Sequence, residues 1–536
     1  MSKKTIFKNA LIANEEGGYS RVDVVVCDEK IVSVNPTKSI IQEEGRIKDC
    51  TNLMLLPGWV NSHTHSSEHG HRGLIRPLPL EMWAVQLFQS DPRDRIKKAI
   101  ELAALQCGIE SMLSGCTAIL DHLYVRTVDE VGIAVESYKK LGIRAYIAPM
   151  LGDDPDGTNY IPLSSKKCNC GGLGPQGKFR ERTSSPDPQL TQKVLSLWRQ
   201  AIELYHDPLH GIEIVLGPVT AYSASAHLLK GAAALRKEFN LCGHCHLLET
   251  RGQALMAFKM FNNNNKDPAR GAVTHLKDNG FLDCCSRPTS LAHCVWVSDK
   301  EMQLLAETNT VVVHNPLSNL RLGSGIAPIS KMLQFGLPVA LGCDGSCSSD
   351  GQDMLEVLKL ATFLPTLHSP DYRDWPSPRQ IALQLAARNG YKALGINAGA
   401  ILPGMEADFA LWDLTSLALL PHTDPLSLLI QGSRCISGTP LDSLYVRGIQ
   451  VVDKGQPLGF TLAELRSSLL HAYASEQYRD SLRVTDPSNT GPFAAACENE
   501  YRAAMNLDKE EDYEEETKVI FYPPSGRVLY DAKITL

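Results

Sequence analysis

The chain has 536 residues, of which 43% are hydrophobic and 21% charged, and its formal net charge is −7 at pH 7. This size and balance are typical of a large globular enzyme, and the small negative charge gives no electrostatic case for nucleic acid or membrane as a partner. The start of the chain has no apolar signal segment, and no apolar run is long enough to span a membrane, so we expect a cytoplasmic protein.

The first part of the chain predicts short β-strands separated by Gly and Asn/Asp turns. The same pattern returns late in the sequence, at residues 407–414 and 443–453. We therefore expect residues 1–56 and 397–456 to form one small, discontinuous β-sandwich-like domain built from both chain ends.

Between these regions, strand-like runs alternate with long helical patterns. This alternation predicts an α/β fold, a (β/α)8 TIM-like barrel, which we place at residues 57–396. The expected strands are 59–65, 117–121, 144–150, 212–217, 241–246, 290–294, 310–314 and 338–343.

Two segments depart from this rhythm. Residues 153–188 are rich in turn formers and follow the third expected strand, so they predict either a lid or specificity loop, or a surface excursion. Residues 457–536 form an expected C-terminal extension, with helical patterns at 461–482 and 492–506. We interpret its acidic run at 509–517 as a solvated face.

The first expected barrel strand ends in His63-Thr64-His65. Side chains two residues apart on a strand point to the same side, so both imidazoles leave one face together. A metal needs more ligands than two histidines.

Further metal-ligand residue types occur where other expected strands end. A lone histidine in a strand is most often a satisfied core residue, but here the residues gather at the face where barrel active sites lie. The whole set therefore predicts a metal site. Its members are His63, His65, His246, His293 and Asp344. His244, Glu249 and His314 are further possible ligands at or just after the same strand ends.

These residues resemble the pattern of the amidohydrolase superfamily over about residues 4–456. Within it, the motifs at 57–65, 72–83, 314–328 and 402–410 are similar to the branch of S-adenosylhomocysteine/methylthioadenosine deaminases, guanine deaminase and triazine chlorohydrolases.

The resemblance implies that His63, His65, His246 and Asp344 are the metal ligands. The catalytic residues would be Glu249, His293 and Asp344: His293 binds the metal-held water or the tetrahedral intermediate, Glu249 carries protons to the substrate ring, and Asp344 accepts the water's proton. Metal-bound hydroxide would attack the ring, and ammonia would leave.

The run at 213–222 bears on both metal number and substrate. Binuclear relatives carry a bridging lysine here, and this run has none, so we expect one divalent metal, zinc, with iron (Fe2+) as the alternative. Nucleoside and guanine deaminases carry a histidine where this chain has Val219. The expected small-molecule substrate is therefore an amino-substituted N-heterocycle of purine, pterin, pyrimidine or triazine type.

Four further residues are candidates for binding substrate: Glu81, Arg72, His314 and Asn315. For each, a surface or supporting polar role is the alternative. We also expect a homodimer, as is consistent with the resemblance.

Three rival hypotheses stay open. The same metal site could open a cyclic amide (lactam) or remove a ring halide, and a catalytically silent barrel could act as a binding protein. Cys242 and Cys245, followed by His246, match thiol-redox and haem-attachment spacings, but they lie in an expected core strand.

Overall fold

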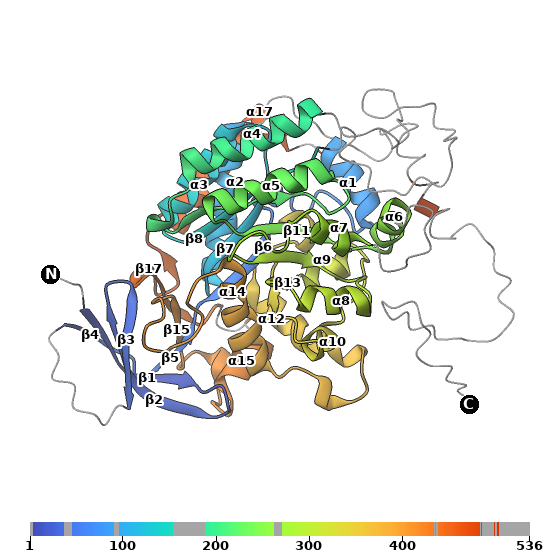
Figure 1. Cartoon of the computed structure of the whole chain (residues 1–536). Helices are drawn as coiled ribbons and strands as arrows, with labels where there is room; N and C mark the ends of the chain where they lie inside the picture. Colours follow the sequence, from blue (N-terminus) through green and yellow to red (C-terminus); the bar gives the residue numbers. More distant parts are fainter. Residues whose placement is uncertain are drawn as a thin grey trace, which may run out of the picture.

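The computed structural model describes most of the chain, and Figure 1 shows a large body of helices around strands with a smaller sheet beside it. The described residues are 4–36, 45–89, 96–153, 188–261, 271–433, 435, 438–482, 484, 498 and 501–502. The predictions for the insertion at 153–188, apart from its two end residues, and for the acidic run at 509–517 lie outside the described residues.

The larger body contains two sheets of parallel strands. One has the order β10-β8-β7-β6, with β9 paired to β8, and the other has the order β11-β12-β13-β14. Each lies within a few residues of an expected strand, although the expected strand at 212–217 is broken into β9 and β10. The strands are β6 (Trp59–Thr64), β7 (Cys116–Tyr124), β8 (Arg144–Leu151), β9 (Ile212–Ile214), β10 (Gly217–Pro218), β11 (Gly243–Leu247), β12 (Thr289–His293), β13 (Thr310–His314) and β14 (Val339–Leu341).

Backbone hydrogen bonds also join the two sheets at both seams. Between the β9–β10 region and β11, the His244 amide donates to the Leu216 carbonyl at 2.9 Å. At the other seam, the amide of Asp344, just past β14, donates to the His63 carbonyl of β6 at 2.9 Å. The carboxyl ends of all these strands therefore lie toward one common region.

Helices follow the strands, as the alternating pattern predicts, and cover them on the outside (Figure 1). They are α1 (Leu80–Gln89), α2 (Lys97–Leu113), α3 (Val128–Leu141), α4 (Pro188–Tyr205), α5 (Ala226–Phe239), α6 (Arg251–Phe261), α7 (Ala272–Asp278), α8 (Asp299–Ala306), α9 (Pro316–Arg321), α10 (Ile329–Gln334), α11 (Ser346–Ser349), α12 (Met354–Phe363), α13 (Pro378–Gln380), α14 (Gly390–Leu394), α15 (Pro425–Gln431), α16 (Leu462–Ala474) and α17 (Glu476–Ser481).

Short 3-10 turns and one π-helical segment complete the helical elements. The turns are η1 (Ser66–His71), η2 (Pro208–His210), η3 (Leu364–Leu367), η4 (Tyr372–Asp374) and η6 (Leu417–Leu419), and the π-helix is η5 (Ile381–Asn389). The turn η1 follows directly on the first pair of histidines, so it sets the direction in which the chain leaves them.

The smaller body is one nine-stranded sheet made from both ends of the chain, in the order β18-β17-β16-β15-β5-β1-β2-β3, with β4 on β1. Its two halves meet where β5 runs antiparallel to β15, with Leu55 opposite Leu411. The strands are β1 (Lys4–Ala13), β2 (Tyr19–Cys27), β3 (Lys30–Pro36), β4 (Arg46–Asp49), β5 (Leu53–Pro57), β15 (Phe409–Asp413), β16 (Leu441–Val446), β17 (Ile449–Asp453) and β18 (Gln456–Pro457).

This sheet is curled, and aromatic side chains fill its inner face. Phe7 of β1 and Tyr445 of β16 lie three strands apart in the sheet, which would separate them by about 14 Å if the sheet were flat. Their ring centroids are only 5.0 Å apart, and Phe409 packs against both. A buried cluster with Val24, Ile31 and Leu55 continues around them.

Two tryptophans pack where the smaller sheet meets the parallel strands. Trp59 of β6 and Trp412 of β15 are both buried, with ring centroids 5.4 Å apart. Gly115 turns toward β7 at φ +95°, and a Cβ on it would lie 2.6 Å from the Trp412 ring. Only glycine gives the backbone this conformation and this close approach together.

Candidate metal centre

Three histidines and one aspartate from three separate places in the sequence meet at the carboxyl ends of the parallel strands. Nε2 of His63 and Nε2 of His65 lie 3.1 and 3.2 Å from Asp344 Oδ1. Nε2 of His246, on β11, lies 3.1 Å from Nε2 of His65. The structure thus brings together the four residues that the sequence predicts as metal ligands.

The outer nitrogens of these rings already have partners. Nδ1 of His65 donates to the His122 carbonyl at 2.6 Å, and Nδ1 of His246 donates to the Val219 carbonyl at 2.6 Å. A carbonyl can only accept, so neutral His65 and His246 carry their proton on Nδ1 and offer a lone pair at Nε2. This is how metal-binding histidines are usually held.

The donor set fits a divalent cation. Three imidazole nitrogens and one carboxylate suit zinc or a similar transition metal, and all four residues are at least nine-tenths buried. His63 Nε2 has no partner in hydrogen-bonding geometry among the described residues. A buried polar atom of this kind is costly unless a ligand satisfies it.

Electrostatics at the cluster favour a cation as well. Burial lowers the pKa of His63 well below its usual range and that of His246 to about 3, so both rings are neutral and able to ligate. Burial opposes charge on His65 too, but its contact with Asp344 and the nearby Glu68 raise the pKa of His65 to about 9. Protonated His65 places a positive charge beside Asp344, and a bound cation would provide that charge instead of the proton.

Backbone strain marks two of the predicted site residues. His293, the last residue of β12, has φ 72°, and Asp344, just past β14, has φ 63°. A non-glycine residue in this left-handed region costs about 1–3 kcal/mol and persists where the surroundings enforce it. At both strand ends this conformation accompanies a side chain that belongs to the cluster.

Glu249 and His293 form a second group beside the cluster. Glu249 Oε2 lies 3.6 Å from His293 Nε2, which is in turn 3.8 Å from Asp344 Oδ2. Burial, together with the charges of Asp344 and Glu81, raises the pKa of Glu249 well above its usual range. This shift favours the protonated acid, which is the form that a proton donor to substrate must have.

The residues that orient this pair were not predicted from the sequence. Asn319 Oδ1, on α9, lies 2.9 Å from His293 Nδ1 and accepts a hydrogen bond from it. His293 Nε2 therefore faces Glu249 and Asp344. Ser324 Oγ lies 3.5 Å from Glu249 Oε1, and Gln253 accepts from the Glu249 amide.

Gln352 joins the strand of the first two histidines to the backbone of Asp344. Its Oε1 accepts from Asn61 Nδ2 and Thr64 Oγ1, both at 2.8 Å, while its Nε2 donates to the Asp344 carbonyl at 2.7 Å. Gln352 is almost fully buried. No strand or helix pattern around it signals this role.

A cavity of about 40 Å³ opens beside the cluster. Apolar side chains form part of its wall, which suits a flat heterocycle. It is lined by His65, Glu68, Leu80, Trp83, Met150, Thr220, His246, Glu249, Gln253, His293, Leu322, Asp344 and Ser348.

The four residues predicted to bind substrate lie in different surroundings. Glu81, at the start of α1 beside the cavity-lining Leu80 and Trp83, is buried and accepts from the Thr250 hydroxyl at 2.5 Å. Arg72 instead donates to Glu110 of α2 at 2.8 Å and does not line the cavity in the part of the chain described. His314 and Asn315 are buried and do not line the cavity, and their side chains lack hydrogen-bond partners among the described residues.

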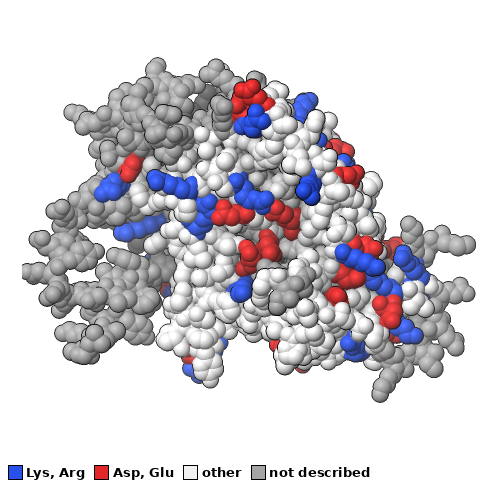
Figure 2. All heavy atoms as spheres, turned by 180° about the vertical axis from the view of Figure 1, so that it is seen from behind, with Lys and Arg blue, Asp and Glu red and all other residues white. Residues whose placement is uncertain are grey.

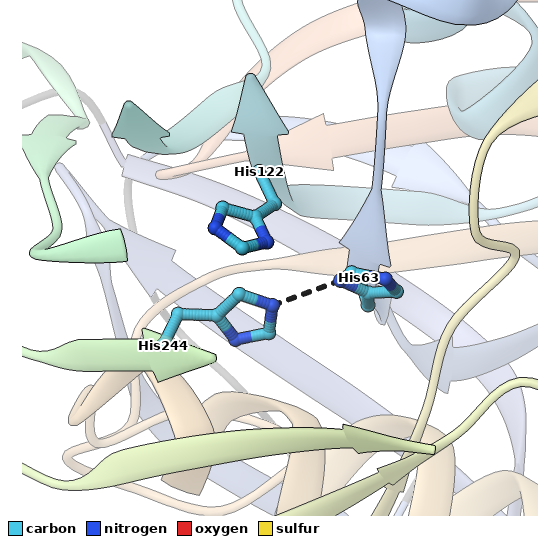
Figure 3. A group of neighbouring side chains, drawn as sticks. All are labelled: His63, His122 and His244. Carbon is cyan, nitrogen blue, oxygen red and sulfur yellow. Dashed lines mark hydrogen bonds between the residues drawn. The ribbon is translucent and has the colours of Figure 1, made fainter. Parts of the chain in front are cut away.

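His122 and His244 form a second layer around the cluster, and neither was predicted as a site residue. In Figure 3 their rings, from β7 and β11, lie beside that of His63, and the ligand atoms of the three lie within 4.8 Å of one another. His122 could have been found from the sequence as the last polar residue of a strand-like run. Burial lowers its pKa and that of His244 well below the usual range.

The two cysteines of the thiol pattern are buried in or next to β11. Burial raises the pKa of Cys242 to about 11 and that of Cys245 above the usual range. Neither is a thiolate at neutral pH, whereas thiol-disulfide chemistry needs one.

Comparison with known proteins supports the sequence resemblance. Residues 54–438 match the model of the Amidohydrolase family. A 5'-deoxyadenosine deaminase from Methanothermobacter thermautotrophicus is 30% identical over 448 residues, which cover 82% of this chain and 92% of that protein. A 5-methylthioadenosine/S-adenosylhomocysteine deaminase from Thermococcus kodakarensis is 29% identical, covering 83% and 92%.

Solved structures show the same fold at lower identity. An adenosine deaminase from Xanthomonas campestris with bound zinc has a TM-score of 0.72 at 20% identity, covering 90% of this chain and 99% of that one. An atrazine chlorohydrolase from Arthrobacter aurescens in complex with zinc has a TM-score of 0.71 at 23% identity, covering 88% and 99%. By sequence and by fold, the chain belongs to the amidohydrolase family.

Proposed function

We propose that this chain is a hydrolase with one divalent metal that removes an amino group from an N-heterocycle and releases it as ammonia. The observation that carries the proposal is the convergence of the Nε2 atoms of His63, His65 and His246, with Asp344 Oδ1 beside the first two and with Glu249 and His293 next to them. His63, His65, His246 and Asp344 would hold the metal, with zinc favoured and iron as the alternative.

The metal would supply a Lewis acid that lowers the pKa of a bound water to about 7. The protein residues supply the proton transfers. Asp344 Oδ2 points toward His293 rather than toward His63 and His65, so it can accept a proton from the attacking water. His293 carries its proton on Nδ1, so its Nε2 can accept a hydrogen bond from the hydroxyl group of the tetrahedral adduct.

Glu249 would act on the substrate ring. Burial and neighbouring charge favour the protonated form of its carboxyl, which can protonate a ring nitrogen and make the adjacent carbon electrophilic. Water then adds to that carbon and gives one proton to Asp344, which passes it to the amino group. The carbon–nitrogen bond breaks, ammonia leaves, and the hydroxyl proton of the adduct returns to Glu249. Asn319 supports this step by holding His293 in the required orientation.

The relatives' named activities support an aminopurine nucleoside as the substrate class. Trp83, Leu80 and Leu322 offer apolar surface for a purine ring, and Glu81 lies beside them. In this chain, however, Val219 stands at the position where the nucleoside and guanine deaminases of the similar branch carry a histidine. Pterins, aminopyrimidines and aminotriazines therefore belong in the test.

The architecture proposed to carry this site is a closed (β/α)8 barrel at residues 57–396. The hydrogen bonds at both seams of the parallel sheets support closure. The domain division at 1–56 with 397–456, and the C-terminal extension at 457–536, are proposed with it. A homodimer and a cytoplasmic location remain predictions; in the part of the chain described, no helix is long and apolar enough to cross a membrane.

The test is ammonia release from a panel of aminopurines, their nucleosides, pterins, aminopyrimidines and aminotriazines, with metal-loaded protein. We expect release from at least one class, and none from an Asp344→Asn variant. Chloride release or a new carboxylate without ammonia would establish dehalogenation or ring opening instead. No product from any substrate would favour a silent binding protein.

A further inference from the structure

Among the three histidines of the cluster, His63 has a different kind of partner at Nδ1. Nδ1 of His65 and of His246 each face a backbone carbonyl, which can only accept a hydrogen bond. Nδ1 of His63 faces the ring of His244, with 2.8 Å between His63 Nδ1 and His244 Nε2 (Figure 3). A histidine nitrogen can donate or accept, so something else must fix the direction of this bond.

The other ring nitrogen of His244, Nδ1, faces Ser290 on β12. His244 Nδ1 lies 2.7 Å from Ser290 Oγ, and that hydroxyl lies 3.4 Å from the Gly243 carbonyl. All three side chains, His63, His244 and Ser290, are completely buried. Bulk water therefore cannot supply an alternative partner at any of these positions.

One requirement sets the direction of every hydrogen bond in the series from His63 to the Gly243 carbonyl. If His63 Nε2 offers its lone pair to a metal, the ring must carry its proton on Nδ1 and donate it to His244 Nε2. His244 then carries its own proton on Nδ1 and donates to Ser290, whose hydroxyl donates to the Gly243 carbonyl. Each atom in this series has the role that its chemistry allows.

We propose that His244, backed by Ser290, is a positioning residue that holds His63 in the tautomer able to bind the metal. This rests on the proposed function, because it takes His63 as a ligand. His244 does not reach the metal in this account, and its effect passes through His63. Second-layer partners of this kind typically change metal affinity by about 10–100-fold.

The alternative for these rings is a second metal bound by His63, His122 and His244. The geometry disfavours it, since two lone pairs facing each other at 2.8 Å would repel, whereas one proton between them makes a hydrogen bond. His122 donates from Nε2 to the Gly217 carbonyl at 3.2 Å, so it is the bond between His63 and His244, and not His122, that disfavours a second metal. His122 packs edge-on against His244, at an interplanar angle of 88°, and so contacts one side of this hydrogen-bonded series.

The test measures the affinity for Zn2+ alone, by competition with a chromophoric chelator, in the full-length protein. His244→Leu removes the acceptor at similar size, and we expect zinc affinity to fall about 10–100-fold. His244→Gln is the matched control, because its amide oxygen reaches about the position of Nε2 and can accept from His63. We expect it to bind zinc nearly as tightly as the wild type.

Ser290→Ala gives a milder second variant, which keeps the test valid if His244→Leu does not fold, as judged by thermal unfolding without zinc. We expect Ser290→Ala to weaken zinc binding in the wild type and to have much less effect in the His244→Leu background. Equal zinc affinity in wild type, His244→Leu and Ser290→Ala would overturn the inference, as would two zinc ions per wild-type chain. Failure of the wild type itself to bind either zinc or iron would instead overturn the proposed function.

Discussion

Glu249 is the residue whose surroundings differ most from those of an ordinary carboxylate. It is buried, it lies 3.6 Å from His293, and its pKa is raised well above the usual range by burial and by Asp344. If it donates a proton to the substrate ring, its loss removes general acid catalysis without removing a metal ligand.

We therefore expect Glu249→Gln to lower kcat by about 10²–10⁴-fold while the bound metal per chain stays unchanged. Glu249→Asp, which keeps an acid on a shorter arm, should recover part of the rate. Steady-state ammonia release together with metal analysis checks both. Loss of metal in Glu249→Gln, or full activity, would contradict the role given to this residue.

For single residues, the sequence predicts the site residues at the strand ends but not the residues that hold those side chains in place. His246, His293 and Asp344 each follow a local apolar run, so their place at the strand ends can be predicted from periodicity. Asn319 and Ser324 lie in and after α9, and only the tertiary placement of this segment beside the end of β12 brings them to His293 and Glu249. A single sequence holds no signal for that approach.

Between elements, the direction of the chain after β6 decides where Arg72 lies. Its closeness in sequence to His63 and His65 favoured a place in the pocket. The turn η1 instead carries Arg72 toward α2, where it donates to Glu110 together with His69. Glu110 also accepts from the Gln352 amide, so one carboxylate ties η1 to the segment before α12.

The ionisation of Glu110 should make the free energy of unfolding depend on pH in the acid range. Burial would raise the pKa of Glu110, but His69 and Arg72 lower it to about 2, from 4.5. A lowered folded-state pKa means that ionised Glu110 stabilises the fold above about pH 4.5, and that this stabilisation is lost as the pH falls toward about 2.

We therefore expect Glu110→Gln to lower the free energy of unfolding at pH 6 and to have a smaller effect at pH 3. Urea unfolding of wild type and variant at both pH values measures the difference. The same difference at both pH values would show that the ionisation of Glu110 does not contribute.

Arg144 joins the two bodies of the molecule. It begins β8, and its guanidinium bonds to Asp408, just before β15, at 3.1 Å, and to Glu406 at 2.8 Å. Arg144 and Asp408 are almost fully buried. Removing the cation leaves buried negative charge without a partner.

We expect Arg144→Met to lower the free energy of unfolding by about 3–5 kcal/mol. Adding Asp408→Asn to that variant should restore part of the loss, because it removes the buried carboxylate that Arg144 paired with, whereas Glu406 still has Lys30 as a partner. Chemical denaturation of the single and double variants checks this. An Arg144→Met variant as stable as the wild type would contradict a structural role for the cluster.

Over the whole molecule, alternation of strand and helix predicted the parallel sheets, and short strands at both ends predicted the shared antiparallel sheet. The curl of that sheet, which brings Phe7 to Tyr445, depends on tertiary packing and could not be predicted. On the face shown in Figure 2, basic and acidic side chains are interspersed.

The central claim is that strands distant in sequence converge to hold a single metal ion. The most direct measurement is the metal content of the purified protein by elemental mass spectrometry, with His246→Ala as the matched variant. The account predicts one zinc or iron ion per wild-type chain and a large loss in the variant. Two ions per chain, or none in the wild type after incubation with zinc and iron, would contradict it.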